Sequence, residues 1–387
     1  MSERLEHTIE ILERLVSFES ISHRPTHGIV GYITEYLASH GLNASLSYDD
    51  AGERANVFVT VGPEIDGGVV LNGHTDVVPV EGQDWQTDPF KLVRQDGRLY
   101  GRGSVDMKGF LACVMAAVPA FKNADLKRPV HIAFSYDEET GGHGMPVLLE
   151  DMAGKSFRPG VVIVGEPTMM KIISGHKGGY ELRTEITGLE AHSCNPNNGV
   201  NAISCAASVI SKIDQLGREF AANPQADSLY DLPYPTFNIG IIEGGSARNA
   251  TAGSCAFDWE MRTMPGQDGT ETLAEIDRFA QQELLPAMRK VHPGADIKLI
   301  VEAPVPALDD ANAGPAIEFV CELTGENSHG VVSFGTDGGY FSDAGFSTVV
   351  FGPGDINRAH KPGEYIEEAE LAAGLDFMDR IANRLSR

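Results

Sequence analysis

Residues 69–76 read Val69-Val-Leu-Asn-Gly-His74-Thr-Asp76, an apolar run that ends in an imidazole and a carboxylate. A short run of Val and Leu is typical of a strand buried on both faces of a parallel sheet. In open α/β sheets, ligands and catalytic groups gather at the carboxyl ends of such strands. This stretch therefore predicts an α/β fold and indicates the edge of the sheet where a functional site should lie.

Three other apolar strands deliver polar residues to the same edge. The strand before residue 136 leads to Asp137, Glu138 and Glu139, the strand at 160–165 leads to Glu166, and the strand at 347–352 leads to His360. The strands before His74 and Asp137 are expected at 68–72 and 129–135, a further strand at 56–61, and helices at 5–18, 28–39 and 107–118. The alternation predicts a mainly parallel sheet covered by helices on both faces.

The pattern changes between residues 174 and 303. Strands with one exposed face are expected at 180–187, 236–242, 253–262 and 296–301, and amphipathic helices at 201–216 and 271–285. This composition predicts a small α+β unit with helices on one face of an open sheet. Buried strands return after it, so we expect a catalytic domain formed by 1–173 and 304–387, interrupted by an inserted domain at 174–303.

Charge and composition exclude several classes of function. The chain has 387 residues, 42% of them hydrophobic, and its 30 Lys and Arg against 55 Asp and Glu give a formal net charge of −25. A field of that sign repels nucleic acids and anionic lipids and accumulates cations. No apolar stretch reaches the roughly 18–20 residues that span a bilayer. We therefore expect no nucleic-acid or membrane partner.

The cysteines and the first residues of the chain predict a compartment. The five cysteines are odd in number and form no C-x-x-C pair, which argues against a disulfide framework or a thiolate zinc site. The first residues enter an amphipathic helix without a signal-peptide pattern. The sequence therefore predicts a cytoplasmic, reduced protein. His131, which lies within a predicted strand, is expected in the core.

The residues at the sheet edge have the chemistry of a catalytic metal site. Imidazole and carboxylate ligands without thiolates suit a zinc-type centre that keeps positions open for water. Asp106, at the start of a buried helix, can bridge two ions, and Asp76 can hold the second nitrogen of His74. Glu138 and Glu139 point in opposite directions on an extended segment, so the pattern alone leaves open which is a ligand and which a base.

The motifs that carry this chemistry are Gly73-His74-Thr-Asp76-Val-Val-Pro, Gly103-Ser-Val-Asp106-Met-Lys-Gly, Asp137-Glu138-Glu139-x-Gly, Gly165-Glu166-Pro and the late His360. With them the chain resembles, over its whole length, the two-metal amidohydrolase and peptidase family. The resemblance implies two divalent ions, Zn or Co, one held by His74, Asp106 and Glu166 and the other by Asp106, Glu139 and His360. It also implies Glu138 as the general base and a cis peptide bond after Asp106.

The same resemblance makes the inserted block a lid and dimerisation domain. His192, in Gly188-Leu-Glu-Ala-His192-Ser, would reach the active site of the second subunit of a homodimer and stabilise the oxyanion. Asn249 and Arg262 would bind the α-carboxylate of the substrate, because the planar guanidinium meets a carboxylate through two parallel hydrogen bonds.

The function implied is hydrolysis of the amide bond of a small N-acyl amino acid. Three stretches, at 165–170, 174–180 and 334–339, most resemble the family members that convert N-acetyl-L-ornithine to ornithine and acetate in arginine biosynthesis. N-succinyl-diaminopimelate or a range of N-acyl amino acids are alternative substrates. Asp337 either receives the side-chain ammonium of the substrate or bonds its own turn.

Two alternatives come from other classes of protein. One is a metal-binding scaffold without turnover, and the other is a serine or cysteine hydrolase. Glu138 argues against the scaffold, because a binding protein has no use for a proton shuttle beside its metal. The sequence contains no nucleophile–base pattern that would favour the other hydrolases.

Overall fold

The computed structural model describes residues 3–387. The chain divides into two compact units: unit 1 comprises the residues up to His176 together with Leu308–Arg387, and unit 2 comprises Lys177–Ala307. These divisions lie a few residues after the positions 173 and 303 expected from the sequence. Each unit is described by itself below.

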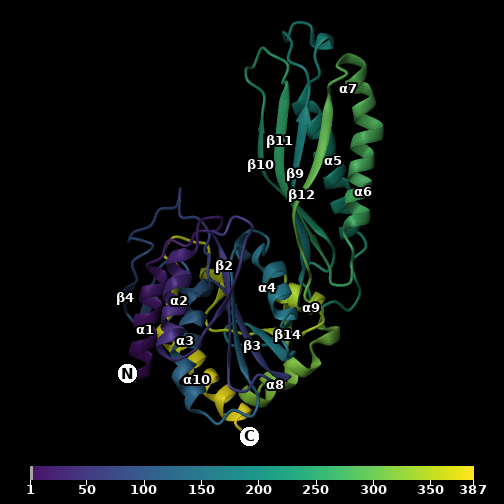
Figure 1. The fold of residues 1–387 in the computed structure, drawn as a ribbon. Helices are drawn as coiled ribbons and strands as arrows, with labels where there is room; N and C mark the ends of the chain where they lie inside the picture. The colour runs from purple at the N-terminus through teal and green to yellow at the C-terminus, as the bar shows by residue number, and fades with distance from the viewer. Residues whose placement is uncertain (1–2) are drawn as a thin grey trace. The chain divides into compact units, whose positions relative to one another are not determined.

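Unit 1 is built on an eight-stranded sheet with the order β1-β2-β6-β3-β7-β14-β8-β13 (Figure 1). The strands are β1 (Ser45–Tyr48), β2 (Ala55–Val61), β3 (Gly67–His74), β6 (Val130–Ser135), β7 (Pro159–Val164), β8 (Ile173–His176), β13 (Gly330–Val332) and β14 (Ser347–Val350). The central strands β6, β3, β7 and β14 are parallel, whereas β2 pairs antiparallel with β1 and β6. The predicted α/β class with a mainly parallel sheet is confirmed.

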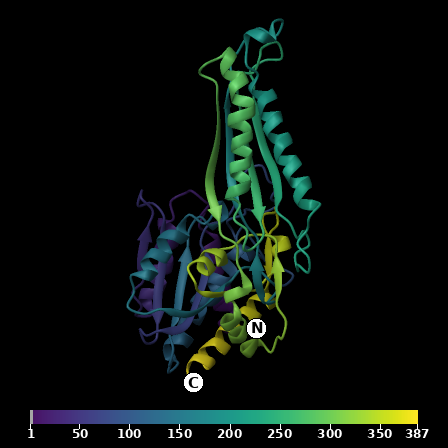
Figure 2. The same ribbon diagram turned by 90° about the vertical axis from the view of Figure 1, so that its right-hand side faces the viewer.

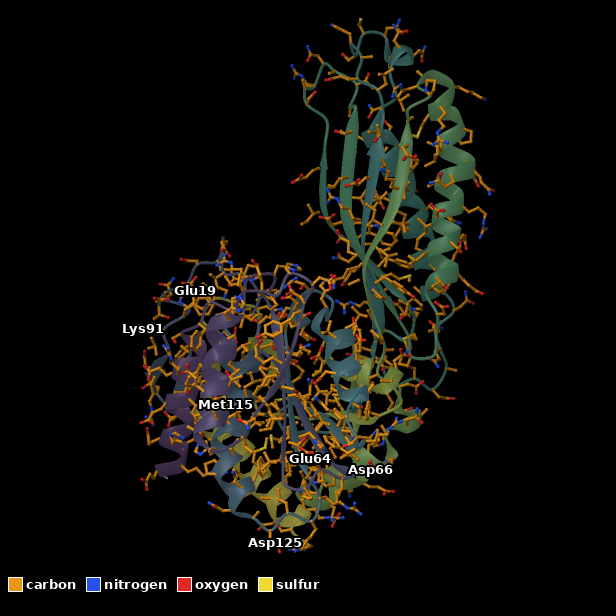
Figure 3. All side chains as sticks on the ribbon, viewed as in Figure 1. Glu19, Glu64, Asp66, Lys91, Met115 and Asp125 are labelled. Atoms are coloured by element: carbon orange, nitrogen blue, oxygen red, sulfur yellow. The ribbon has the colours of Figure 1, made fainter. Side chains whose placement is uncertain are left out.

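Alternate residues of these strands face two separate cores. In β2, Val57 and Val59 belong to the larger core, while Phe58 faces the smaller one. Helices α1 (Glu3–Val16), α2 (His27–Ser39), α3 (Gly109–Asn123), α8 (Gly314–Thr324) and α10 (Glu368–Leu385) cover the first face, and α4 (Gly144–Ala153) and α9 (Gly338–Asp343) cover the second. Figure 3 shows Met115 of α3 inside this unit and Glu19, Lys91 and Asp125 at its periphery. The prediction of helices on both faces is therefore confirmed.

Within residues 3–387, one helical run is long and apolar enough to cross a membrane by length and composition. It spans Ser104–Asn123, and 89% of its most apolar window is buried inside the chain. The run combines a kinked first turn (Ser104–Lys108) with α3, which packs against α1 and α10. Its hydrophobic composition is accounted for by its place in the core of unit 1.

A small three-stranded sheet joins two distant parts of unit 1. It pairs β15 (Tyr365–Glu367) with β5 (Arg98–Tyr100), and β5 with β4 (Val93–Gln95), all antiparallel. Tyr365 lies opposite Tyr100 in this register. The segment that follows His360 is thereby held next to the segment that leads to Asp106.

Unit 2 is a four-stranded antiparallel sheet with the order β10-β11-β9-β12. The strands are β9 (Gly178–Thr187), β10 (Thr236–Gly244), β11 (Ser254–Thr263) and β12 (Asp296–Val305). Helices α5 (Ala202–Ala221), α6 (Thr270–Phe279) and α7 (Leu285–Val291) pack on one face (Figure 2). Inward residues of β11, such as Phe257 and Trp259, alternate with outward ones, as a sheet with one covered face requires.

Candidate active site

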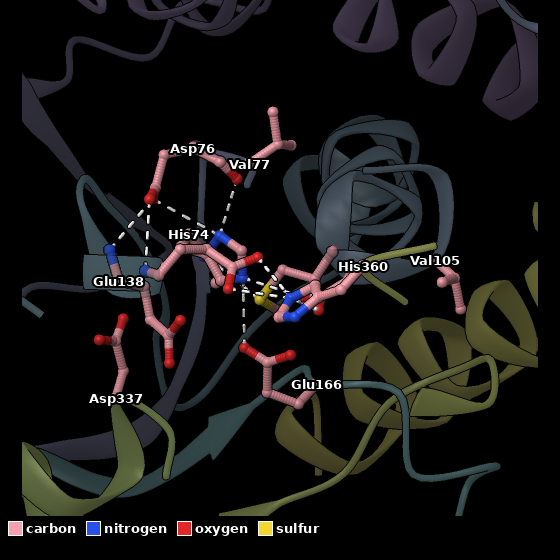
Figure 4. A network of polar contacts seen from close by, with 12 residues as sticks. His74, Asp76, Val77, Val105, Glu138, Glu166, Asp337 and His360 are labelled. Carbon is pink, nitrogen blue, oxygen red and sulfur yellow. Dashed lines mark hydrogen bonds and ion pairs between the residues drawn. The ribbon is translucent and has the colours of Figure 1, made fainter. Parts of the chain in front are cut away.

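The parallel strands bring the predicted residues together at one edge of the sheet. His74 ends β3, Glu138 and Glu139 follow β6, and Glu166 follows β7. Because β3 is hydrogen-bonded to both β6 and β7, and β7 to β14, the ends of these strands meet. His360, which follows β14, joins the same group (Figure 4).

Asp106 lies between two imidazoles. Its Oδ1 is 3.1 Å from Nε2 of His74, and its Oδ2 is 3.2 Å from Nε2 of His360. The peptide bond after it is cis, as the resemblance implies. The carboxylate thus presents one oxygen to each of two groups of candidate ligands.

Two glutamates complete these groups. Oε1 of Glu166 lies 3.5 Å from Nε2 of His74, and the carboxylate of Glu139 lies 3.0 Å from Nε2 of His360. His360 is half-exposed, whereas the other ligand side chains are nearly inaccessible. The side of the group that carries His360 therefore faces solvent, which leaves access for water.

Asp76 connects the histidine to the two glutamates. Nδ1 of His74 lies 2.9 Å from the backbone oxygen of Asp76 and 3.5 Å from its Oδ1. The carboxylate accepts hydrogen bonds from the backbone N–H groups of Glu138, at 3.1 Å, and Glu139, at 3.3 Å, and from Ser22 Oγ at 2.7 Å. Asp76 therefore orients the glutamate turn as well as the imidazole.

The electrostatics of the group call for cations. Burial raises the pKa of Glu138, Glu139 and Glu166, and neighbouring carboxylates raise each pKa further. Hydrogen bonds to Asp106 and Glu139 raise the pKa of His360 to about 10. Burial opposes ionisation of Asp106, but hydrogen bonds from His360 and His74 lower its pKa well below the usual range. In the metal-free chain, protons bound to these side chains neutralise part of the negative charge of the carboxylates. Divalent ions could neutralise that charge instead.

The donor atoms fit metal ions. Ligand atoms of His74, Asp106 and Glu139 lie within 4.8 Å of one another, and so do those of His74, Glu138 and Glu166. Oε1 of Glu166 is buried without a hydrogen-bond partner. Imidazole and carboxylate donors suit zinc and similar ions. The Glu138 carboxylate lies as close to His74 and Glu166 as a metal ligand would. These distances therefore do not decide whether Glu138 is a ligand or the general base.

Asp337 also lies at this edge, beside Glu138 (Figure 4). Its Oδ2 accepts a hydrogen bond from Ser135 Oγ at 2.5 Å, and its Oδ1 is buried without a hydrogen-bond partner. Burial raises the pKa of this carboxyl to about 6. The side chain makes no capping bond to α9, so it does not bond its own turn as the simpler interpretation expects.

The remaining predicted residues belong to unit 2. His192 and Asn249 lie on neighbouring segments. The backbone N–H of Ser193 donates to the carbonyl oxygen of Asn249 at 3.0 Å, and His192 forms an isolated antiparallel β-bridge with Ala250. Both are exposed. Arg262 pairs with Glu260 at 2.6 Å, so the fork expected to bind a substrate carboxylate contacts a carboxylate of its own strand.

Several residues that hold the site together were not predicted. Ser22 bonds Asp76, Glu364 bonds the backbone at Asp106, and Gln83 bonds the backbone of His360. The nearness of Glu364 to His360 in the chain is the one local signal that could have drawn attention to it.

A largely buried group of imidazoles and carboxylates at the carboxyl edge of a parallel sheet is typical of a metal-dependent hydrolase. The chain belongs to the peptidase family M20/M25/M40, whose model matches residues 70–384. The resemblance inferred from the motifs is thereby confirmed.

Individual relatives agree with this membership. The chain is 33% identical over 376 residues to an acetylornithine deacetylase of Myxococcus xanthus, covering 96% of this chain and 95% of that protein. It is similar in fold to an M20 family metallo-carboxypeptidase of Sulfolobus solfataricus, with a TM-score of 0.73 and 20% identity over 100% of both chains. A dinuclear metal binding peptidase of the same family from Bacillus subtilis matches with a TM-score of 0.64 and 15% identity, covering 98% and 97%.

Proposed function

We propose that this chain hydrolyses the amide bond of N-acetyl-L-ornithine, releasing L-ornithine and acetate. The observation that carries the chemistry is the position of Asp106, with one carboxylate oxygen toward His74 and the other toward His360. The choice of substrate is supported by similarity, over nearly the whole length of both chains, to a relative named for that activity. The reaction would serve arginine biosynthesis in the cytoplasm.

Two bound divalent ions, zinc or cobalt, would polarise the amide carbonyl and make water a better nucleophile. His74, Asp106 and Glu166 would hold one of them, and Asp106, Glu139 and His360 the other. Glu138 would take the proton from the attacking water and pass it to the nitrogen of the leaving amine. Its buried position beside other carboxylates raises its pKa, which suits a group that must also act as an acid.

Substrate binding is assigned to three side chains. Arg262 and Asn249 would bind the α-carboxylate, with Arg262 exchanging its contact with Glu260 for the substrate. Asp337 would receive the side-chain ammonium, since its Oδ1 is buried without a hydrogen-bond partner. A cation at that oxygen would pair with a charge that otherwise costs free energy to bury.

His192 is assigned to stabilisation of the oxyanion, and a homodimer follows from that role. Its Nδ1 accepts a hydrogen bond from the backbone N–H of Cys194 at 3.1 Å, and its exposure in unit 2 would let Nε2 act on the site of a second copy. A hydrogen-bond donor in this position contributes roughly 3–4 kcal/mol to the barrier reduction. Unit 2 (Lys177–Ala307), which corresponds to the inserted block expected at 174–303, would then be the lid and dimerisation domain.

A substrate panel tests the proposal. Release of the free amino acid would be measured from N-acetylornithine, N-succinyl-diaminopimelate and N-acetylmethionine, each with zinc or cobalt added and again after chelation. The proposal predicts metal-dependent turnover with kcat/KM highest for N-acetylornithine. Higher kcat/KM for another substrate would keep the site and replace the substrate. Metal binding without any turnover would favour the scaffold.

The contact between Ser174 and His329 does not support the alternative function of a serine hydrolase. Ser174 Oγ lies 2.7 Å from Nδ1 of His329, as a nucleophile and its base would. The serine is fully buried in β8, however, and neither residue belongs to the groups of candidate ligands at the carboxyl edge of the sheet.

A further inference from the structure

Beneath the metal-ligand group of unit 1 lies an ion pair with no role in the reaction described above. Arg102 Nη1 donates to Oε2 of Glu364 at 2.6 Å, and both side chains are only 1% exposed. Burying two opposite charges costs several kcal/mol per ion in desolvation, and apolar residues of similar size often stabilise a fold as well or better. Stability alone therefore gives no reason for this pair.

The other oxygen of Glu364 holds the backbone that carries Asp106. Oε1 accepts hydrogen bonds from the N–H of Val105 at 3.1 Å and from the N–H of Asp106 at 3.2 Å. These N–H groups lie in the kinked turn before α3, where Asp106 and Met107 have non-helical backbone angles. The carboxylate of Glu364 thus fixes the main chain at Asp106, whose side chain faces both imidazoles.

Gln83 connects the same network to His360, another residue of the candidate metal site. Its Oε1 accepts from Arg102 Nη2 at 2.5 Å and from the indole N–H of Trp85 at 3.0 Å. Its Nε2 donates to the backbone oxygen of His360 at 3.2 Å. The guanidinium of Arg102 also lies 5.1 Å from the centre of the Trp85 ring, which holds its plane.

A single buried cation therefore connects two residues from distant parts of the chain. On one side, Arg102 acts through Glu364 on the backbone of Asp106, and on the other it acts through Gln83 on the backbone of His360. The side chains of Asp106 and His360 meet at 3.2 Å. None of the contacts described to Arg102, Glu364 or Gln83 reaches His74 or Glu166.

We propose that Arg102, Glu364 and Gln83 form a positioning network for the two-metal site, in which Glu364 holds the backbone of the shared ligand Asp106 and Gln83 holds the backbone of His360. The three residues act through the backbone of the ligands and touch neither ion nor substrate. Residues that orient metal ligands from outside typically contribute 10–100-fold to metal affinity. The inference rests on the proposed metal site and is independent of the substrate.

The test is a metal titration of the metal-free chain by calorimetry, with zinc and separately with cobalt. The variants are Gln83→Met, which keeps the volume and removes both kinds of hydrogen bond, and Glu364→Gln, which keeps an acceptor for the backbone but turns an amide N–H₂ toward Arg102. The matched control is Gln86→Met, an exposed glutamine on the same loop. Thermal denaturation of each metal-free chain reports any loss of structure.

The proposal predicts two binding events in the unchanged chain and in Gln86→Met. In Gln83→Met, which acts on His360 alone, one event should lose roughly 10–100-fold in affinity while the other is retained. In Glu364→Gln, which acts on the ligand shared by both ions, both events should weaken. Cooperative melting of the metal-free Gln83→Met chain would show that it still folds, although loss of the acceptor for Arg102 should lower its melting temperature relative to the control. Unchanged affinities in both variants, or equal losses of both events in Gln83→Met, would overturn the network. Absence of any binding in the unchanged chain would instead refute the proposed metal site.

Discussion

The Oδ2 atom of Asp106 lies 3.2 Å from Nε2 of His360, while its Oδ1 lies 3.1 Å from Nε2 of His74. One carboxylate thus lies between two imidazoles: His74, at the end of β3, and His360, in the segment that follows β14. Divalent ions are commonly bridged in this way at separations of roughly 3.5–4 Å in two-metal hydrolases. The function proposed above depends on this relationship more than on any other contact.

Replacing each of the two adjacent glutamates in turn should show which one is the general base and which one is a metal ligand. Glu138→Gln should lower kcat by roughly 10²–10⁴-fold, because it removes the proton shuttle. Glu139→Gln should instead weaken metal binding, because Glu139 lies against His360. Steady-state kinetics together with calorimetric metal titration measure both effects. Loss of an ion in Glu138→Gln, with full retention in Glu139→Gln, would reverse the two assignments.

Asp337→Asn should affect substrates according to their side-chain charge. A hydrogen bond to a charged group is worth about 1.5–3 kcal/mol, so KM for N-acetylornithine should rise by roughly 10–100-fold. KM for N-acetylmethionine, which carries no ammonium, should change little. Ser135→Ala, which removes the neighbouring hydroxyl and keeps the carboxylate, is the matched control. Equal losses of both substrates in Asp337→Asn would exclude a contact with the ammonium.

Mixed dimers should show whether His192 acts on the second subunit. His192→Ala alone should lower kcat by roughly 10²–10³-fold, as loss of an oxyanion donor does. When this variant is mixed with Glu138→Gln under conditions of subunit exchange, each mixed dimer should regain one intact site. Acetate release before and after mixing measures the effect. A mixture no more active than its components would place His192 and Glu138 of the same chain in one site.

His131 should make the metal-free chain less stable in acid. Its ring stacks between Phe58 and Phe157, and burial lowers its pKa from 6.5 to about 4. As the pH falls below 6.5, the unfolded chain takes up the proton first, so stability is lost progressively down to about pH 4.

Replacing this histidine should remove that part of the pH dependence. Between pH 7 and pH 5 the unchanged chain should lose about 2 kcal/mol more than His131→Phe. Urea denaturation of both metal-free chains at several pH values measures the difference. Parallel stability curves for the two chains would show that His131 does not titrate in this way.

The core of the fold and the site could be predicted because each strand carries its own signal. The apolar run that ends at His74 is local, and so are those that end at Glu138 and Glu166. By contrast, α4, α8 and α10 were not predicted. The helix α10 begins with a capping box between Glu367 and Glu370, a signal present in the sequence that could have revealed it.

The supporting contacts could not be predicted because they depend on pairing between distant segments. Arg102 and Glu364 meet only because β5 pairs with β15. Nothing in the local sequence marks a charged residue as buried. Likewise, Asp76 was expected to hold the imidazole, but its bonds to the backbone of Glu138 and Glu139 depend on how the turn after β6 is folded.

The most direct test of the central claim is acetate release from N-acetylornithine before and after complete removal of metal, with the metal content of each sample measured. The account predicts that the metal-free chain is inactive and that zinc or cobalt restores turnover, with full activity at two ions per chain. A chain shown to be free of metal that still hydrolyses N-acetylornithine at the full rate would contradict it.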